Sequence, residues 1–389
     1  MYNFKNQYEE NYTFDNIIDP WKNQHQNEKI KSSRLSILST YKKADNLLIS
    51  PKFSIKKKSE IVVIGFKIYQ SLSLELQSKT HVILKPRDIF RYKHGLKKIL
   101  KNFTFDVKIY KKVYNKIINN INFDFSEVEK KLQILRPKIL IISSTIDIVQ
   151  SIWAFYAKKI GVNVVCIQHG LFSSFNSPHA LERNIVDYYI SLGESQSKLI
   201  ERIIPKNKHK LLFDNSFFYH KIPKEKSLNI CLIGNDYENY GTEGIDRKKK
   251  TLKVYDELIK NLKNCTPYQI NFYYKKHPSE NWLGKIADNV SFIKDKNLEI
   301  IHFYFGVSST LLMELASQHF CSIQICSKEL EIDRYENFGF CKSLDLEKIE
   351  NDWVNLLNID KIKIPCLKKK NLVKILEEIL NENKKSEYL

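Results

Sequence analysis

The sequence of 389 residues lacks the short motifs by which many nucleotide-using enzymes are identified. No Asp-x-Asp pair is present to hold a divalent ion beneath a diphosphate, and no His, Cys and Asp residues cluster at metal-ligand spacing. A P-loop and a Gly-x-Gly-x-x-Gly loop are also missing, which excludes the common glycine-rich phosphate loops. We therefore expect neither a resident metal nor a cofactor.

Patterned cysteines and long apolar runs are missing as well. The seven cysteines include no Cys-x-x-Cys pair, and Cys166 and Cys231 lie inside apolar runs, which is typical of reduced thiols in a cytoplasmic protein. The first residues include acids and no apolar core, so we expect no signal peptide. The stretch 139–157 contains Asp147 and Gln150 and fits a strand and a helix better than a membrane span.

Positive charge and apolar residues are abundant. Lys and Arg number 63 against 44 Asp and Glu, which gives a net charge of +19. Hydrophobic residues make up 43% and aromatic residues 12%, so global disorder is excluded. The charge indicates an anionic partner, and nucleic acid, a membrane surface and a phosphorylated substrate all fit.

Short β-rich runs alternate with amphipathic stretches in two successive series. This alternation predicts an α/β fold with two Rossmann-like domains facing a cleft. The charged segment Lys221–Ser227, which contains a proline, separates the two series. We predict a polar lead-in over residues 1–58, a first domain over 59–222, and a second domain with terminal helices over 223–389.

His169 follows a strand of the first domain, within Gln168-His169-Gly170. The carboxyl ends of parallel strands form the edge where ligands of open α/β sheets bind. An imidazole with a pKa near neutrality can remove a proton from an acceptor hydroxyl there, so His169 is a candidate base. A histidine that caps the strand by bonding to the backbone fits the position equally well.

A second histidine follows a strand of the second domain, in Lys275-Lys276-His277-Pro278. Pro278 lacks a backbone N–H and biases His277 towards extended angles, so the strand ends there. An imidazole beside two ammonium groups suits a phosphate or a carboxylate. His-Pro is a common dipeptide, and its position after a strand is what makes it a candidate site.

A third motif runs from an apolar strand through Gly306 into Ser308-Ser309-Thr310, where we expect a helix to begin. Free N–H groups and the positive end of the helix dipole would then point at an anion. Glu314, on the same helical face as Thr310, is placed to reach a ribose hydroxyl. A plain serine N-cap is the alternative interpretation.

Gly234 and Asn235 follow the first strand of the second domain. They therefore also lie at a predicted sheet edge and are candidates for lining the cleft. The alternative is a turn in which Asn235 bonds to the backbone.

The His-Gly, His-Pro and Ser-Ser motifs, in this order and spacing, resemble those of bacterial GT-B glycosyltransferases that build surface polysaccharides. They are most similar to motifs of sialyl- and polysialyltransferases, capsule Kdo transferases and CDP-glycerol glycerophosphotransferases. The resemblance covers roughly residues 135–330. It implies an acceptor site in the first domain and a nucleotide-donor site in the second.

The resemblance also implies roles for single residues. His277, Ser308 and Ser309 would bind the CMP part of the donor. The missing Asp-x-Asp pair separately implies a metal-independent transferase, in which Lys275, Lys276, His277 and the helix terminus would neutralise the leaving phosphate. The sialyltransferases carry an acidic pair before a glycine near the acceptor. This sequence has a histidine there instead, as the glycerophosphotransferases do.

Glu243, which precedes a glycine, remains an acidic candidate, so His169, His277 and Glu243 are the candidate catalytic residues. The sequence thus predicts a transferase of capsule or lipooligosaccharide synthesis that moves sialic acid or a Kdo-like sugar from a CMP donor to a glycan. Transfer of a polyol phosphate from a CDP donor is the first alternative. A sugar-nucleotide 2-epimerase and a nucleic-acid-binding protein are the others, although RNP-like and helix-turn-helix signals are absent.

The segment from Lys85 to Lys116 contains eleven basic residues against Asp88 and Asp106. Apolar residues recur in it at near-helical spacing. A basic amphipathic helix can lie on an anionic inner leaflet, so this segment predicts peripheral association of a cytoplasmic protein with the inner membrane. The alternative is a solvated helix face above a stripe that packs on the core.

Overall fold

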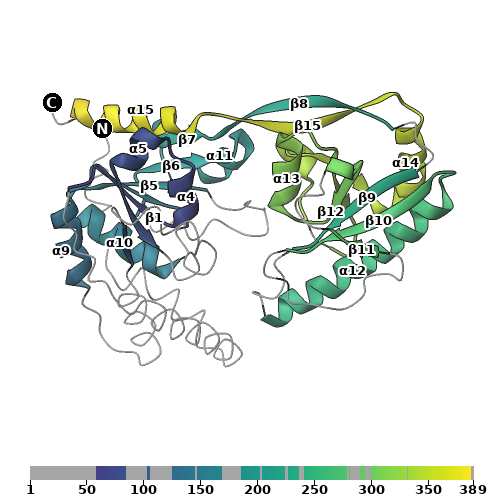
Figure 1. Cartoon of the computed structure of the whole chain (residues 1–389), viewed down its shortest axis with the longest axis horizontal. Coiled ribbons are helices and arrows are strands. Elements are labelled where there is room, and N and C mark those ends of the chain that lie inside the picture. The colour runs from purple at the N-terminus through teal and green to yellow at the C-terminus, as the bar shows by residue number, and fades with distance from the viewer. Residues whose placement is uncertain are drawn as a thin grey trace.

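The computed structural model describes residues 58–84, 103–105, 125–144, 147–168, 185–201, 204–223, 227–235, 241–277, 280, 290–293, 299–330 and 332–386. Within these ranges the chain forms two α/β lobes that lie side by side (Figure 1). The predicted lead-in lies outside the described residues apart from residue 58.

The first lobe is built on a seven-stranded sheet in the order β3-β2-β1-β4-β5-β6-β7, and all neighbouring strands are parallel. Its strands are β1 (Ile61–Ile64), β2 (Thr80–Leu84), β3 (Phe103–Phe105), β4 (Ile139–Ile142), β5 (Asn163–Ile167), β6 (Tyr188–Ser191) and β7 (His209–Leu211). Its helices are α4 (Phe66–Gln70), α5 (Leu74–Ser78), α9 (Ser126–Leu135), α10 (Ile148–Lys159), α11 (Glu194–Ile200) and the single turn η1 (Lys206–Lys208).

The second lobe has a six-stranded parallel sheet in the order β11-β10-β9-β12-β13-β14. Its strands are β9 (Ser227–Ile233), β10 (Gln269–Lys275), β11 (Val290–Phe292), β12 (Phe303–Gly306), β13 (Ser322–Cys326) and β14 (Lys342–Asp345). Its helices are α12 (Gly241–Asn264), α13 (Thr310–Ser317) and α14 (Ile349–Leu357), with the turns η4 (Tyr335–Phe338) and η5 (Leu346–Lys348).

Both sheets share one strand order over six strands, to which the first sheet adds β7 at its edge. In each, the first strand lies in the middle, the next two strands follow on one side, and the chain then crosses to the other side. This is the doubly wound order 3-2-1-4-5-6 of the Rossmann fold. The predicted α/β class with two Rossmann-like domains is therefore confirmed.

Strand β1 shows why the sheets are covered on both faces. Its sequence Ile-Val-Val-Ile is fully buried, as parallel strands between two helical layers require. Val62 and Ile64 pack into one hydrophobic cluster, whereas Ile61 and Val63 point to the opposite face and pack into another. The two-residue alternation of a strand thus divides the core of the first lobe into two layers.

An antiparallel ribbon of β8 (Phe213–Lys221) and β15 (Lys361–Lys369) connects the lobes, and α15 (Leu372–Ser386) follows it back onto the first lobe (Figure 1). Leu376 and Ile379 of α15 are fully buried in the cluster that contains Ile61 of β1. Lys210 of β7 also pairs with Glu382 of α15 at 2.6 Å. The last helix of the sequence region 223–389 therefore covers the sheet of the first lobe.

The helical pattern predicted across Lys85–Lys116 is interrupted by a strand. Phe103–Phe105 forms β3 at the edge of the first sheet, because its β-prone residues pair with β2. The rest of that segment lies outside the described residues, so its membrane association stays a prediction. In the described parts of the chain, no helix combines the length and the apolar character needed to cross a bilayer.

Candidate functional site

Three neighbouring strands of the second sheet end in the residues that the sequence singles out. β10 leads into Lys276 and His277, β9 into Gly234 and Asn235, and β12 into Ser308. The strand order reverses between β9 and β12, and open α/β sheets bind ligands at this switch point, beyond the carboxyl ends of the strands. We therefore place the candidate site at this edge.

Asn235 joins the two sides of the switch point. Its Nδ2 donates to the Ser308 carbonyl oxygen and, at 3.0 Å, to the Ser308 hydroxyl oxygen. Both acceptors belong to the loop after β12, so the Asn235 side chain bonds across the sheet edge. These bonds fix the backbone just before α13 and orient the half-buried Ser308 hydroxyl.

Helix α13 begins at this edge because Ser309 caps it. The Ser309 hydroxyl accepts from the Leu311 N–H at 3.3 Å, and the hydroxyl-bearing residue Thr310 is the first residue of the helix. Gly306 packs closely under the helix, since a Cβ there would lie 3.0 Å from Leu312 Cδ1. The helix thus presents its positive end beside Ser308, while the predicted ribose ligand Glu314 is exposed on its surface.

Glu280 holds the chain after β10 in place. Its Oε2 accepts from the His277 backbone N–H at 2.8 Å, and its Oε1 accepts from the Tyr274 hydroxyl at 3.0 Å. Lys248 of α12 lies 3.7 Å from Oε1, and the Glu280 side chain is only 1% exposed. A buried carboxylate with these three partners fixes where His277 leaves the sheet.

Gly234 makes room for this carboxylate. A Cβ at position 234 would collide with the Glu280 carboxylate and would lie 2.6 Å from the Tyr274 hydroxyl oxygen. The Gly234 N–H also donates to the Lys275 carbonyl at 2.9 Å, which keeps the ends of β9 and β10 together. A larger residue at position 234 would therefore displace the Glu280 carboxylate or the Tyr274 hydroxyl at the edge of the site.

The two lysines after β10 have different surroundings. The Lys276 ammonium lies 4.7 Å from the centre of the Phe292 ring. Lys275 lies near Cys231 of β9, where burial raises the pKa of the thiol to about 12 and the Lys275 charge partly opposes that shift. Because Cys231 stays a neutral thiol at physiological pH, it supplies no nucleophile beneath the site.

Gln324 of β13 supports the loop after β12 from the other side. Its Nε2 donates to the Val307 and Asp333 carbonyls at 3.1 and 2.9 Å. Its Oε1 accepts from the Tyr335 N–H at 2.7 Å and the Ser343 hydroxyl at 2.8 Å. A fully buried amide thus fixes the residue that precedes Ser308.

At the corresponding edge of the first lobe, polar side chains bond both to backbone groups and to one another. Gln168 accepts from the Leu192 N–H at 2.9 Å and donates to the Gln196 side chain at 2.7 Å. Gln150 accepts from the Ser143 N–H at 2.7 Å. His169 and Gly170 lie outside the described residues, as do Pro278 and the side chain of Glu243.

Sequence reasoning missed Glu280, Tyr274 and Lys248. A signal for Glu280 was present, because it follows His277 by three residues with a proline between them. A glutamate at that spacing can bond back to a free backbone N–H, as in a capping box. Tyr274 and Lys248 gave no comparable signal, because they meet Glu280 only through the packing of β10 against α12.

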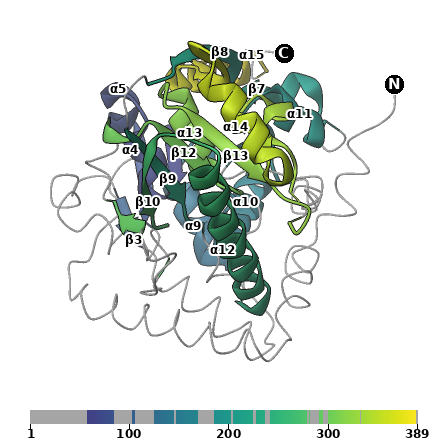
Figure 2. The same cartoon turned by 90° about the vertical axis from the view of Figure 1, so that its right-hand side faces the viewer.

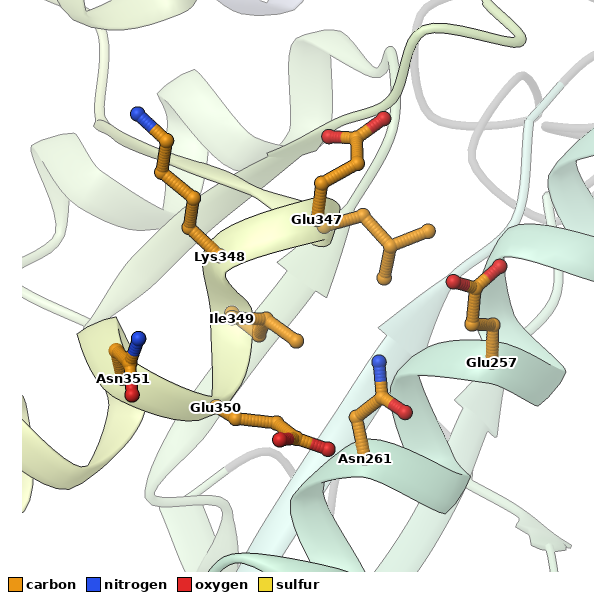
Figure 3. Close-up of a pocket in the computed structure, with 8 residues that line it drawn as sticks. Glu257, Asn261, Glu347, Lys348, Ile349, Glu350 and Asn351 are labelled. Atoms are coloured by element: carbon orange, nitrogen blue, oxygen red, sulfur yellow. The ribbon is translucent and has the colours of Figure 1, made fainter.

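A pocket of about 290 Å³ lies elsewhere in the second lobe, between α12 and the start of α14 (Figure 3). Its lining includes three carboxylates, of Glu257, Glu347 and Glu350, against one ammonium group, of Lys348, so its net negative charge disfavours a phosphate. It shares no residue with the edge described above. Among the described residues, no group of three or more His, Cys, Asp or Glu side chains could hold a metal ion.

No family model matches this chain, and no curated protein matches it. Solved structures with a similar fold include MurG of Acinetobacter baumannii, at 12% identity and a TM-score of 0.46 over 77% of this chain and 91% of that one. A putative UDP-N-acetylglucosamine 2-epimerase from Listeria monocytogenes shows 10% identity and a TM-score of 0.46 over 78% and 88%. The lipopolysaccharide outer core galactosyltransferase WaaB shows 15% and 0.45 over 78% and 89%. At these identities the likeness concerns the fold alone, so function is argued from the site.

Proposed function

We propose that this protein is a glycosyltransferase that binds a nucleotide-activated sugar at the carboxyl edge of its second sheet. The observation that carries the proposal is the pair of bonds from Asn235 to Ser308 across the switch point, at the start of α13. The helix terminus, the Ser308 hydroxyl and His277 together offer hydrogen-bond donors to a phosphate. Lys275 and Lys276, directly before His277, add positive charge to this segment.

The donor in this proposal is a CMP-activated acid sugar such as sialic acid or a Kdo-like sugar. An acceptor hydroxyl attacks the anomeric carbon, and the bond from that carbon to the phosphate oxygen breaks. His277 and the α13 terminus stabilise the charge that develops on the departing CMP. The order of His-Pro and Ser-Ser motifs along the second domain supports CMP as the nucleotide.

The first lobe supplies the base in this proposal. His169 follows β5, directly after Gln168, whose amide is fixed by Leu192 and Gln196. His169 takes the proton from the acceptor hydroxyl, and the acceptor is a glycan of the cell surface. Glu243 is the second candidate for this role.

Calorimetric titration of the full chain with CMP, CDP, UDP and GDP tests the donor. We expect CMP to bind most tightly, and Ser308→Ala should weaken it by roughly tenfold, the effect of one hydrogen bond to a charged group. A matched control is Ser317→Ala, on the last turn of α13, which should leave CMP binding unchanged. Preference for UDP or GDP would contradict the acid-sugar assignment, and tighter binding of CDP would favour polyol-phosphate transfer.

A further inference from the structure

The ribbon of β8 and β15 has one face on the second lobe and one face in solvent. On the inner face, the His220 ring lies 5.7 Å from the Phe303 ring, and Ile364 is fully buried. Residues opposite each other in the antiparallel pair share a face and alternate along the strands. The outer set, here called the ribbon face, consists of Phe217, Tyr219, Lys221, Lys361, Lys363 and Pro365.

The ribbon face combines exposed aromatic rings with positive charge. Phe217 is 51% exposed and Tyr219 is 61% exposed, which is unusual for side chains of this size. Three of the six residues are lysines and none is acidic. Ile359, just before β15, is 46% exposed and extends the apolar part of the surface. In both views the ribbon lies at the periphery of the molecule (Figures 1 and 2).

We propose that the ribbon face docks on an anionic phospholipid bilayer. Aromatic rings insert favourably at the level of the headgroups, where one side is apolar and the other wet. Lysines around them keep their stems along apolar surface while their ammonium groups contact lipid phosphates. The proposal is independent of the donor assigned above, because it rests on residues that the candidate site does not use.

The ring geometry favours a bilayer over a nucleic acid. Single-stranded nucleic acids bind by stacking bases on free aromatic faces. Here the Phe217 and Tyr219 rings meet at 84° with centroids 5.7 Å apart, so they offer no common platform for successive bases. The Lys363 ammonium lies 4.0 Å from the centre of the Phe217 ring and covers that face. The ribbon face therefore presents ring edges and lysine ammonium groups, which suit contact with a bilayer surface.

Flotation of the full chain with vesicles tests the proposal. We expect binding to vesicles of equal parts phosphatidylglycerol and phosphatidylcholine, and little binding to phosphatidylcholine alone. The variant Lys361→Gln/Lys363→Gln should weaken the affinity by about 30-fold, because each near-surface lysine contributes roughly fivefold. Phe217→Ser/Tyr219→Ser should also weaken it, while leaving the dependence on phosphatidylglycerol in place.

The matched control is Lys250→Gln/Lys260→Gln, which removes the same charge from two exposed positions of α12, a helix that is not part of the ribbon. It should bind vesicles like the wild type. The proposal is overturned if the ribbon variants bind as tightly as this control. It is also overturned if they lose affinity for a fluorescent single-stranded oligonucleotide but keep their affinity for vesicles, since the ribbon face would then be a nucleic-acid surface.

Discussion

The two lobes have the same strand order but use the carboxyl edges of their sheets differently. In the second lobe, Asn235 after β9 bonds to Ser308 after β12 across the switch point, and Glu280 holds the segment after β10 through Tyr274 and the His277 N–H. In the first lobe, Gln168 accepts from the Leu192 N–H and donates to Gln196, and Gln150 accepts from the Ser143 N–H. In the second lobe these bonds fix the residues around the start of α13 and His277, whereas in the described part of the first lobe they fix the loops after β4 and β6.

This difference fits a division of labour between binding and proton transfer. A leaving nucleotide needs several fixed donors, which a rigid edge supplies without reorganisation. A base needs only one side chain within reach of the acceptor hydroxyl, and the proposal assigns this role to His169. The comparison therefore predicts that damage to the two edges has different kinetic consequences.

The strongest test of this comparison is to remove one histidine from each lobe. His169→Ala should lower kcat by on the order of a hundredfold to ten-thousandfold while CMP affinity stays unchanged, because a general base acts on the acceptor. His277→Ala should lower both kcat and CMP affinity, because it loses a donor to the phosphate. Steady-state kinetics with calorimetry measure both quantities, and each variant is the control for the other.

Equal losses of CMP affinity in both variants would contradict the prediction that only the second lobe binds the nucleotide. If both variants retained full activity while folded, as judged by circular dichroism, the assignment of the site to these histidines would be wrong.

The sequence predicted the central strands of both sheets, because buried parallel strands are short apolar runs that can be recognised in the sequence. Runs such as Ile139–Ile142 and Ser322–Cys326 needed no tertiary information. The strands β3, β7, β8, β14 and β15 were missed, although the alternation of lysine and isoleucine over Lys361–Ile364 in β15 is a strand signal.

The site was only partly predictable, because its support comes from contacts between distant segments. Ser308 and His277 stood out as motifs at strand ends. Their supports did not, since the Gln324 amide meets Val307 across 17 positions, and Lys248 meets Glu280 through the packing of a helix on a strand. A single sequence shows which residues follow a strand, but only the folded structure shows which of their side chains contact one another.

The lobes should also differ in acid stability. Burial lowers the pKa of His81, on β2 of the first lobe, from 6.5 to about 4, with a smaller contribution from Lys131. Between pH 6.5 and about pH 4, His81 is therefore protonated in the unfolded chain but neutral in the folded chain. The stability from neutral His81 is present above pH 6.5 and is lost as the pH falls towards 4, by about 3 kcal/mol.

Tryptophan fluorescence can separate the two lobes in this experiment. Trp153 is fully buried in the first lobe and Trp353 in the second. Variants that keep only one of these two, with Trp21 and Trp282 replaced as well, therefore report on each lobe. As the pH falls, the urea concentration at the midpoint of unfolding should decrease in the Trp153 signal before it decreases in the Trp353 signal. His81→Gln, which cannot take up a proton, should flatten that dependence; if it keeps the wild-type slope, His81 is not the cause.

Two glycines provide the finest comparison between the lobes. Gly161, at the end of α10 in the first lobe, has a φ of +78° and nothing within 4 Å of a built Cβ. Gly161→Ala should therefore cost about 1–2 kcal/mol of unfolding free energy through backbone strain alone. Gly234→Ala should cost about 1–3 kcal/mol through collision with the Glu280 carboxylate. Only the second substitution should also weaken CMP binding in calorimetry.

A second substitution at Glu280 identifies the source of the Gly234→Ala cost. In Glu280→Ala the carboxylate is gone, so adding Gly234→Ala to it should cost clearly less than in the wild type, and the two substitutions should couple in a double-mutant cycle. Gly161→Ala with Glu280→Ala should be additive, because those positions share no partner. If the effects of Gly234→Ala and Glu280→Ala were additive, the glycine would not be needed to make room for the Glu280 carboxylate. The interpretation that Gly234 and Glu280 pack as one unit at the edge of the second sheet would then be wrong.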